Sequence, residues 1–269
     1  MSLLATPGGY RLRYAHRNLG ASPTIVLVHG WRRSHRIWDV PLYRFADAGF
    51  EVIAFDNRGM GESDKPVGDD DYDVDVLAGD LAFVLERLAV EDVILLGWSM
   101  GCSIALRYLQ RVGSRAGKLV FVSGPVSLVA TERLPWGFER DALQRYLESV
   151  VAAFPRAEPS DGTDVMPPAS LWRTWPDAIT LQTPLEAAMR IVAEQAKLDF
   201  TDFMCQVEIP TLALYGSQDP FYDPALAHWI AAEVPDGRAV VVEGSAPAVH
   251  IDASDRFVEV VTGFAAGAI

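Results

Sequence analysis

The sequence contains only two cysteines, Cys102 and Cys205. They cannot build a disulfide framework, and neither the C-x-x-C nor the H-E-x-x-H motif of a metal site occurs. No segment reaches the roughly 20 consecutive apolar residues of a transmembrane helix. The start, Met1–Pro7, has neither the basic end nor the apolar stretch of a signal peptide. We therefore expect a soluble cytoplasmic protein that does not enter a membrane.

Positive charge is also scarce, because 23 Lys and Arg residues face 36 Asp and Glu residues, a net charge of −13. This balance argues against nucleic acid or an anionic membrane as a partner. The densest acidic run, Asp69–Asp75, lacks the spaced oxygen ligands of a calcium loop and is expected to cap the helix that follows. The sequence has no internal repeat, and its length favours one domain with an insertion.

Short apolar runs alternate with helical patterns along most of the chain. The runs typical of strands buried on both faces are 24–28, 51–55, 93–96, 118–123, 211–215 and 238–242. Helical patterns lie between them, for example at 73–88 and 256–264. Such alternation predicts an α/β fold with a doubly wound, mostly parallel sheet, whose catalytic loops lie at the carboxyl ends of the strands.

A first strand or hairpin is expected at 11–15, and the alternation stops between the sixth strand, 118–123, and residue 206. Helical stretches at 139–151 and 184–198 flank a proline-rich loop, and no strand of the buried type occurs. We therefore expect a core formed by residues 1–124 and 207–269. Residues 125–206 are expected to form a helical lid over the catalytic edge.

The motif Gly97-Trp98-Ser99-Met100-Gly101 lies between the apolar run 93–96 and a helical stretch. A serine at such a strand–turn–helix junction adopts a strained backbone conformation, which neighbouring glycines leave room for. The turn lifts the Ser99 hydroxyl above the sheet, at a helix N-terminus that favours developing negative charge. Ser99 is thus the expected nucleophile, and a chance G-x-S-x-G is the alternative.

Four motifs along essentially the whole chain resemble the α/β-hydrolase fold family. They are His29-Gly30-Trp31, Asp56-x-Arg58-Gly59-x-Gly61-x-Ser63, Gly97-x-Ser99-x-Gly101 and Gly216-x-x-Asp219. The His-Gly-Trp loop, the following Arg36-Ile-Trp and the late Asp255-Arg-Phe look most like the branch of cofactor-free haloperoxidases, perhydrolases and esterases. The resemblance implies no metal or organic cofactor.

A serine nucleophile needs a base, and the base needs an orienting acid. In this family the order along the chain is Ser, acid, His. The acid is expected at Asp219, with Asp223 as the nearby alternative. The family's last loop usually reads Gly-His-x-x-His, and its first histidine is the base. Here Pro247 stands at that position and His250 at the second, so either the loop is rearranged to bring His250 to Ser99, which we expect, or the serine lacks an ordinary base.

Attack on a carbonyl creates an oxyanion that needs hydrogen-bond donors already in place. The resemblance assigns this oxyanion hole to the backbone N–H groups of Trp31 and Met100. An apolar pocket, suited to an acyl or aromatic substrate, is expected to be lined by Trp98, Trp136, Trp172 and Trp175. The basic residues that follow Trp31 are expected to form a solvated face rather than to bind an anionic group; they are Arg32, Arg33 and Arg36.

These expectations combine into a serine hydrolase for a small to medium hydrophobic carboxylic ester or related carbonyl compound. Ser99 attacks, His250 relays the proton, Asp219 orients His250, and water resolves the acyl-enzyme. One alternative is another reaction of the fold: perhydrolysis, C–C cleavage, lyase chemistry or cofactor-free oxygenation. The other is a ligand-binding relative that has lost the catalytic histidine. The only partner expected is the small hydrophobic substrate, and no oligomeric state is predicted.

Overall fold

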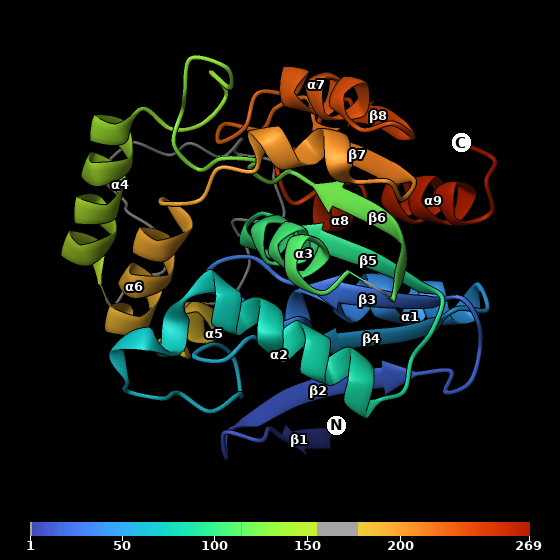
Figure 1. Cartoon of the computed structure of the whole chain (residues 1–269), viewed down its shortest axis with the longest axis horizontal. Coiled ribbons are helices and arrows are strands. Elements are labelled where there is room, and N and C mark those ends of the chain that lie inside the picture. Colours follow the sequence, from blue (N-terminus) through green and yellow to red (C-terminus); the bar gives the residue numbers. More distant parts are fainter. Residues whose placement is uncertain (1, 114, 155–176) are drawn as a thin grey trace.

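The computed structural model describes residues 2–113, 115–154 and 177–269. Eight strands in this part of the chain form one sheet of order β1-β2-β4-β3-β5-β6-β7-β8 (Figure 1). The strands are β1 (Ser2–Ala5), β2 (Arg11–Arg17), β3 (Thr24–Val28), β4 (Glu51–Phe55), β5 (Val93–Trp98), β6 (Ala116–Val122), β7 (Thr211–Gly216) and β8 (Gly237–Val242). The β1–β2 and β2–β4 pairs are antiparallel and the other pairs are parallel. The predicted mostly parallel sheet is confirmed.

The central strands are buried because helices cover both faces of the sheet. Every residue of β3, β4 and β5 is buried, which explains their continuous apolar runs. The register places Val28 opposite both Phe55 and Gly97, so that these three strands end level with one another. The loops that follow them therefore meet at one edge of the sheet.

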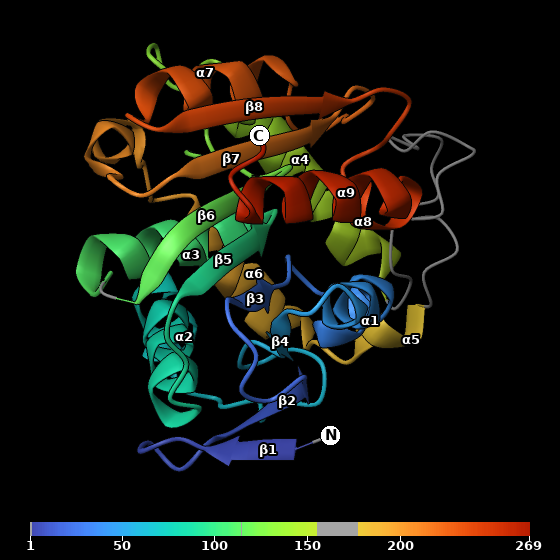
Figure 2. The same ribbon diagram turned by 90° about the vertical axis from the view of Figure 1, so that its right-hand side faces the viewer.

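Two helical layers pack on the two faces of the sheet (Figures 1 and 2). Alternate strand residues point to each layer. One layer holds α2 (Val74–Arg87), α3 (Met100–Arg111) and α7 (Ala225–Glu233), packed with Val26 and Val28 of β3 in one core cluster. The other holds α1 (Asp39–Asp47) and α9 (Ser254–Ala265), packed with Ile25 and Leu27 in a second cluster. The short helices η1 (His35–Trp38), η2 (Asp69–Tyr72) and α8 (Val249–Asp252) lie in the connecting loops.

Between β6 and β7 the described residues form helices and no named strand. These helices are α4 (Arg140–Ala153), α5 (Asp177–Leu181), α6 (Leu185–Gln195) and the 3₁₀ helix η4 (Thr201–Gln206). The helical stretches expected at 139–151 and 184–198 are present as α4 and α6, which lie beside each other at one end of the sheet (Figure 1). Whether 125–206 is a separate lid stays a prediction. None of the described helices combines the length and apolar composition that a membrane span requires.

Candidate active site

Ser99 occupies a sharp, strained turn between β5 and α3. Its backbone has φ 53° and ψ −122°, a region that residues with a side chain rarely adopt and that costs about 1–3 kcal/mol. The turn is held on both sides, since the Ser99 N–H donates to Val122 O at 3.0 Å and the Cys102 N–H donates to Ser99 O at 2.9 Å. The surrounding backbone thus imposes the conformation that the motif predicted.

The two glycines of the motif are required by close backbone contacts. A Cβ on Gly97 would lie 2.6 Å from the carbonyl oxygen of Gly101. A Cβ on Gly101 would lie 2.2 Å from the carbonyl oxygen of Val28, at the end of β3. Both distances are too short for any side chain, so α3 can start directly against β3 only with glycine at these positions.

The loop after β3 packs against this turn. A Cβ on Gly30 would lie 3.1 Å from the Ser99 Cβ, which shows how closely the loop approaches the serine. The Trp31 indole N–H donates to Ala188 O of α6 at 2.8 Å and holds Trp31 in place. Met100 is the first residue of α3. The two residues expected to supply oxyanion donors therefore flank Ser99 from different segments.

A cavity opens over Ser99. It is lined by Trp31, Arg32, Arg33, Trp98, Ser99, Met100, Ser123, Leu128, Phe138, Leu143, Tyr146, Leu147, Val192, Gln195, Phe221, Tyr222 and Pro247. Most of these side chains are apolar or aromatic, and α4 and α6 supply five of them. The site can therefore enclose a hydrophobic molecule next to the serine hydroxyl.

The four tryptophans expected in the pocket do not all lie there. Trp98 lines it. Trp136 is not among the lining residues and packs on Trp229, with ring centroids 6.1 Å apart, because it belongs to the core beneath. Trp172 and Trp175 lie outside the described residues.

Asp219 follows β7 with its carboxyl group turned inward. Its Oδ1 accepts hydrogen bonds from the backbone N–H groups of Phe221 at 2.9 Å and Tyr222 at 3.1 Å. The residue is partly exposed, but its Oδ2 is buried. Burial raises the pKa of this carboxyl to about 7, although the hydrogen bonds from the two N–H groups and the nearby Ser123 hydroxyl act in the opposite direction. The alternative acid, Asp223, is exposed and accepts the Ala225 N–H at the start of α7.

The structure does not bring His250 together with Ser99 and Asp219. His250 is fully buried in α8 and is not a lining residue of the cavity. Its ring contacts Trp38, Trp98 and Phe257, with centroids at 4.3, 4.9 and 5.9 Å. Neither ring nitrogen has a hydrogen-bond partner among the described residues. Burial lowers the pKa of His250 to about 3, so the ring stays neutral.

The expected rearrangement of the loop therefore does not occur, because aromatic rings from η1, β5 and α9 enclose His250 on the α1/α9 side of the sheet. Pro247, where the family resemblance leads us to expect the base, instead lines the cavity. Its carbonyl oxygen accepts the Trp98 indole N–H at 3.0 Å.

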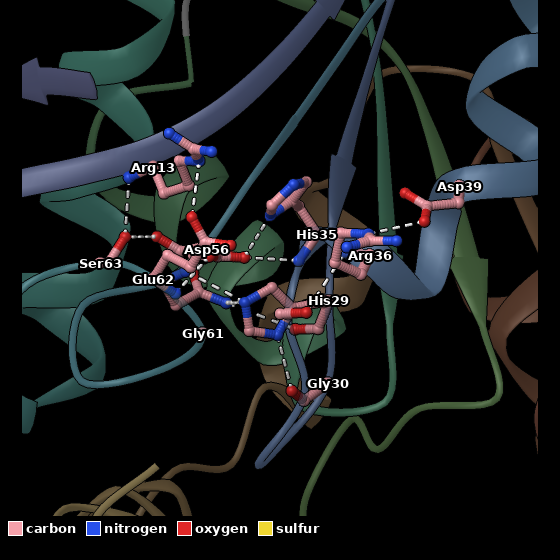
Figure 3. A network of polar contacts seen from close by, with 12 residues as sticks. Arg13, His29, Gly30, His35, Arg36, Asp39, Asp56, Gly61, Glu62 and Ser63 are labelled. Carbon is pink, nitrogen blue, oxygen red and sulfur yellow. Dashed lines mark hydrogen bonds and ion pairs between the residues drawn. The ribbon is translucent and has the colours of Figure 1, made fainter. Parts of the chain in front are cut away.

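The other four histidines lie outside the cavity. His35 donates to Asp56 through Nδ1 at 2.7 Å, and His29 accepts the Asn57 N–H at 3.0 Å (Figure 3). His16 contacts Glu51 in the sheet, and His228 is exposed on α7. No histidine belongs to the described lining of the cavity.

The pair of His35 and Asp56 holds the loop after β3. Asp56 also accepts the Glu62 N–H at 2.7 Å, so the carboxylate joins that loop to the turn after β4 (Figure 3). Burial by itself would raise the pKa of Asp56, but the hydrogen bond and charge of His35 bring it below its usual value. Arg58 does not pair with Asp56; it forms a bidentate contact with Asp80, at 2.6 Å for each bond.

Two groups at the site were missed in the sequence. The Tyr222 hydroxyl lies close to Ser99, and burial raises the pKa of Tyr222, so the phenol remains protonated. Ser123 directly follows β6, lies beside Asp219 and lines the cavity. The only available signal was position, because Tyr222 lies three residues after Asp219 and Ser123 is the last residue of the predicted strand at 118–123.

The basic residues after Trp31 do not form the expected solvated face. Arg32 and Arg33 have exposed fractions of 2% and 5%, and both line the cavity. Arg36 alone is exposed, and its Nε donates to Asp39 at 2.6 Å. The expectation is corrected for two of the three residues, because helices α4–α6 cover a loop that looks solvent-facing in the sequence.

Comparisons with known proteins agree with this fold. A sequence family described as alpha/beta hydrolase fold matches residues 23–254. The chain is 28% identical to the non-heme chloroperoxidase CPO-A1 of Kitasatospora aureofaciens over 95% of each chain. It is 29% identical to the bifunctional esterase/perhydrolase DCH of Acinetobacter calcoaceticus, over 81% of this chain and 82% of that one. The esterase EaEST of Exiguobacterium antarcticum has the same fold, with a TM-score of 0.86 over 98% of each chain at 22% identity.

Proposed function

Because the chain belongs to the α/β-hydrolase fold family, we propose that it binds a small to medium hydrophobic ester or related carbonyl compound over Ser99 and hydrolyses it slowly. One observation carries this proposal. Ser99 has the strained geometry of a nucleophile and lines an apolar cavity, yet no histidine is among the described lining residues. Similarity to esterases and perhydrolases supports an ester as the substrate class.

In the proposed reaction the Ser99 oxygen attacks the ester carbonyl. The N–H groups of Trp31 and Met100 stabilise the oxyanion, and the alcohol leaves to give an acyl-enzyme that water then hydrolyses. The family's base would normally take the Ser99 proton. Loss of a triad member typically lowers the rate roughly 10⁴–10⁶-fold, so we expect slow turnover.

We assign the role of proton acceptor to Asp219, because its buried Oδ2 has no hydrogen-bond partner among the described residues and its carboxyl lies beside Ser123, which lines the cavity. A carboxyl group with a pKa near 7 is about half ionised at neutral pH, which suits a general base. His250 is not part of the proposed mechanism, because it is enclosed by aromatic rings. Tyr222 cannot be the base, because its raised pKa keeps the phenol protonated.

A second candidate is ligand binding without turnover. Two observations favour it: Pro247 lines the cavity where the family resemblance leads us to expect the base, and the protonated Tyr222 phenol lies close to the Ser99 hydroxyl. Such a protein would keep the pocket and the oxyanion donors but release no product.

Rapid mixing of stoichiometric enzyme with 4-nitrophenyl butyrate separates the two candidates, with Ser99→Ala as the control. Hydrolysis predicts one equivalent of nitrophenol released per Ser99, slow turnover afterwards, and neither in Ser99→Ala. Calorimetric binding of the non-hydrolysable analogue butyranilide, without nitrophenol release that depends on Ser99, would instead establish ligand binding.

A further inference from the structure

We propose that the Ser123 hydroxyl relays the proton of Ser99 to Asp219. The inference rests on the proposed function, because it supplies the path from the nucleophile to the assigned proton acceptor. It concerns the activation of Ser99 alone, however, and does not require that an ester be turned over.

The first observation is that Asp219 and Ser99 belong to strands that are not neighbours. Ser99 follows β5, Asp219 lies in the loop after β7, and β6 separates these two strands in the sheet. Neighbouring strands lie about 4.8 Å apart, so the two segments leave the sheet about 10 Å from each other. Asp219, moreover, is not among the described lining residues of the cavity. A group at the end of β6 is in the right place to close this gap.

The second observation is that Ser123 occupies that place. It directly follows β6, which pairs with β5 on one side and with β7 on the other. The Ser99 N–H donates to Val122 O at 3.0 Å. The Ser123 N–H donates in turn to Leu214 O at 3.1 Å. Ser123 therefore lies between Ser99 and the loop that carries Asp219, and it lines the same cavity as Ser99.

The third observation is that the oxygens needed for a relay are buried and unpaired. Ser123 is fully buried, and its Oγ has no hydrogen-bond partner among the described residues. Oδ2 of Asp219 is buried in the same way, and the carboxyl of Asp219 lies beside Ser123. A hydroxyl has one donor and two acceptor lone pairs, so Ser123 can accept from Ser99 and donate to Asp219 at the same time. Ser123 also has φ 38°, a strained conformation of the kind that concentrates at functional sites.

In the relay, the Ser99 O–H bond breaks as the Ser99 oxygen bonds to the carbonyl carbon. The released proton passes to Ser123 Oγ while the hydroxyl proton of Ser123 passes to the Asp219 carboxylate. Ser123 ends with as many protons as it began with, and Asp219 becomes protonated. The reverse path then delivers a proton to the leaving alcohol oxygen, which restores the Asp219 carboxylate.

The test measures the rate at which a fluorophosphonate probe labels Ser99, because labelling requires deprotonation of Ser99 but neither ester binding nor deacylation. In wild type the rate should rise with pH and level off above the Asp219 pKa of about 7. In Ser123→Ala this rise should be lost, and the rate on the plateau should fall by roughly 100-fold, as for loss of a general base. Adding Asp219→Asn should then cause little further loss, because both substitutions interrupt one path.

A second readout follows the protons directly. Since two protons move together in the relay, the wild-type labelling rate in mixtures of H₂O and D₂O should follow a curve against the deuterium fraction. The plot should become a straight line in Ser123→Ala. Ser123→Gly also lacks the hydroxyl but relaxes the backbone at φ 38°, so it should behave like Ser123→Ala and separates loss of the hydroxyl from strain.

The matched control is Ser127→Ala. The Ser127 hydroxyl is buried in the same segment and donates to Val129 O at 2.7 Å, but Ser127 is not among the described lining residues. Its removal should leave the labelling rate and the pH profile as in wild type.

A rise with pH that persists in Ser123→Ala would overturn the proposal. Loss of the rise in Tyr222→Phe instead would assign the relay to the other hydroxyl close to Ser99. Labelling that depends on Ser123, in a wild-type protein that does not hydrolyse 4-nitrophenyl butyrate, would uphold the relay and reject hydrolysis. Absence of labelling in wild type would contradict the relay and the proposed nucleophile together.

Discussion

The indole N–H of Trp98 donates a hydrogen bond to the carbonyl oxygen of Pro247 at 3.0 Å. Trp98 directly precedes Ser99, so this bond fixes Pro247 beside the nucleophile turn. The other side of the same indole packs edge-on against His250, with centroids 4.9 Å apart. One side chain thus holds the proline at the position of the base and helps to enclose the histidine that could have replaced it.

Restoring a histidine at position 247 should increase hydrolysis. The substitution Pro247→His keeps the backbone carbonyl that binds Trp98 and places an imidazole among the cavity residues. General base catalysis contributes roughly 10²–10⁴-fold, so we expect the initial rate with 4-nitrophenyl butyrate to rise by about 100-fold. Pro247→Ala controls for loss of the proline ring and should stay near the wild-type rate. An equal rate in both variants would show that the missing base is not what limits Ser99.

His250 should make folding sensitive to acid. Its pKa is about 3 in the folded protein against 6.5 for a free side chain, so between these values the unfolded chain binds a proton that the folded chain does not. The free energy of unfolding therefore falls as pH decreases from about 6.5 to 3, by about 1.4 kcal/mol per pH unit for this group. Urea unfolding at a series of pH values gives the slope of the free energy of unfolding against pH. In His250→Phe this slope should be smaller by the amount that one bound proton contributes. An unchanged slope would contradict the burial of a neutral imidazole.

Asp219 should control the pH dependence of the reaction. If its carboxylate accepts the Ser99 proton, the wild-type rate increases with pH and levels off above its pKa of about 7. Asp219→Asn should lose this rise and retain only slow, pH-insensitive release. The control Asp223→Asn removes the exposed carboxylate of the same loop and should preserve the wild-type profile. A wild-type profile in Asp219→Asn would assign the proton to another acceptor.

The same pKa shift predicts an effect on stability. Because the folded-state pKa of Asp219 lies above its unfolded value of 3.8, the folded protein holds an extra proton between the two, and stability falls as pH rises from about 4 to 7. Asp219→Asn should therefore be more stable than wild type at pH 8, with little difference at pH 3. The difference in unfolding temperature between Asp219→Asn and wild type, recorded at pH 8 and at pH 3, measures this change in stability.

Alanine at Gly101 and alanine at Gly79 should change the free energy of unfolding in opposite directions. Gly101→Ala would place a Cβ 2.2 Å from Val28 O, so we expect a loss of about 3 kcal/mol or more in the free energy of unfolding. Gly79 lies on the exposed face of α2, and a Cβ added there would meet no heavy atom within 4 Å, so Gly79→Ala should stabilise by up to about 1 kcal/mol. Urea unfolding curves of both variants provide the measurement, and similar effects would contradict the packing of α3 on β3.

The sheet and the serine turn could be predicted because their signals are local. The run at 25–28 is apolar at every position because both faces of β3 are covered, and Gly97 and Gly101 are required by contacts on either side of one turn. Such patterns depend on a few neighbouring residues and can be seen without the fold.

The direction of the last loop could not be predicted in this way. Whether Pro247 or His250 faces Ser99 depends on Trp98, Trp38 and Phe257, which lie on three elements far apart in the sequence. Chain position placed His250 between the last strand and the last helix, but it gave no side-chain direction. Likewise, adjacent arginines indicate a solvated surface unless helices from a distant segment cover them, as they do here.

The most direct test of this account is the rate at which a fluorophosphonate probe labels Ser99 in wild type and in His250→Phe, with the modified peptide identified by mass spectrometry and Ser99→Ala as the blank. The account predicts slow labelling at Ser99 and the same rate in both proteins, because His250 does not reach the serine. A fall of 100-fold or more in a folded His250→Phe variant would show that His250 is the base and would contradict the account.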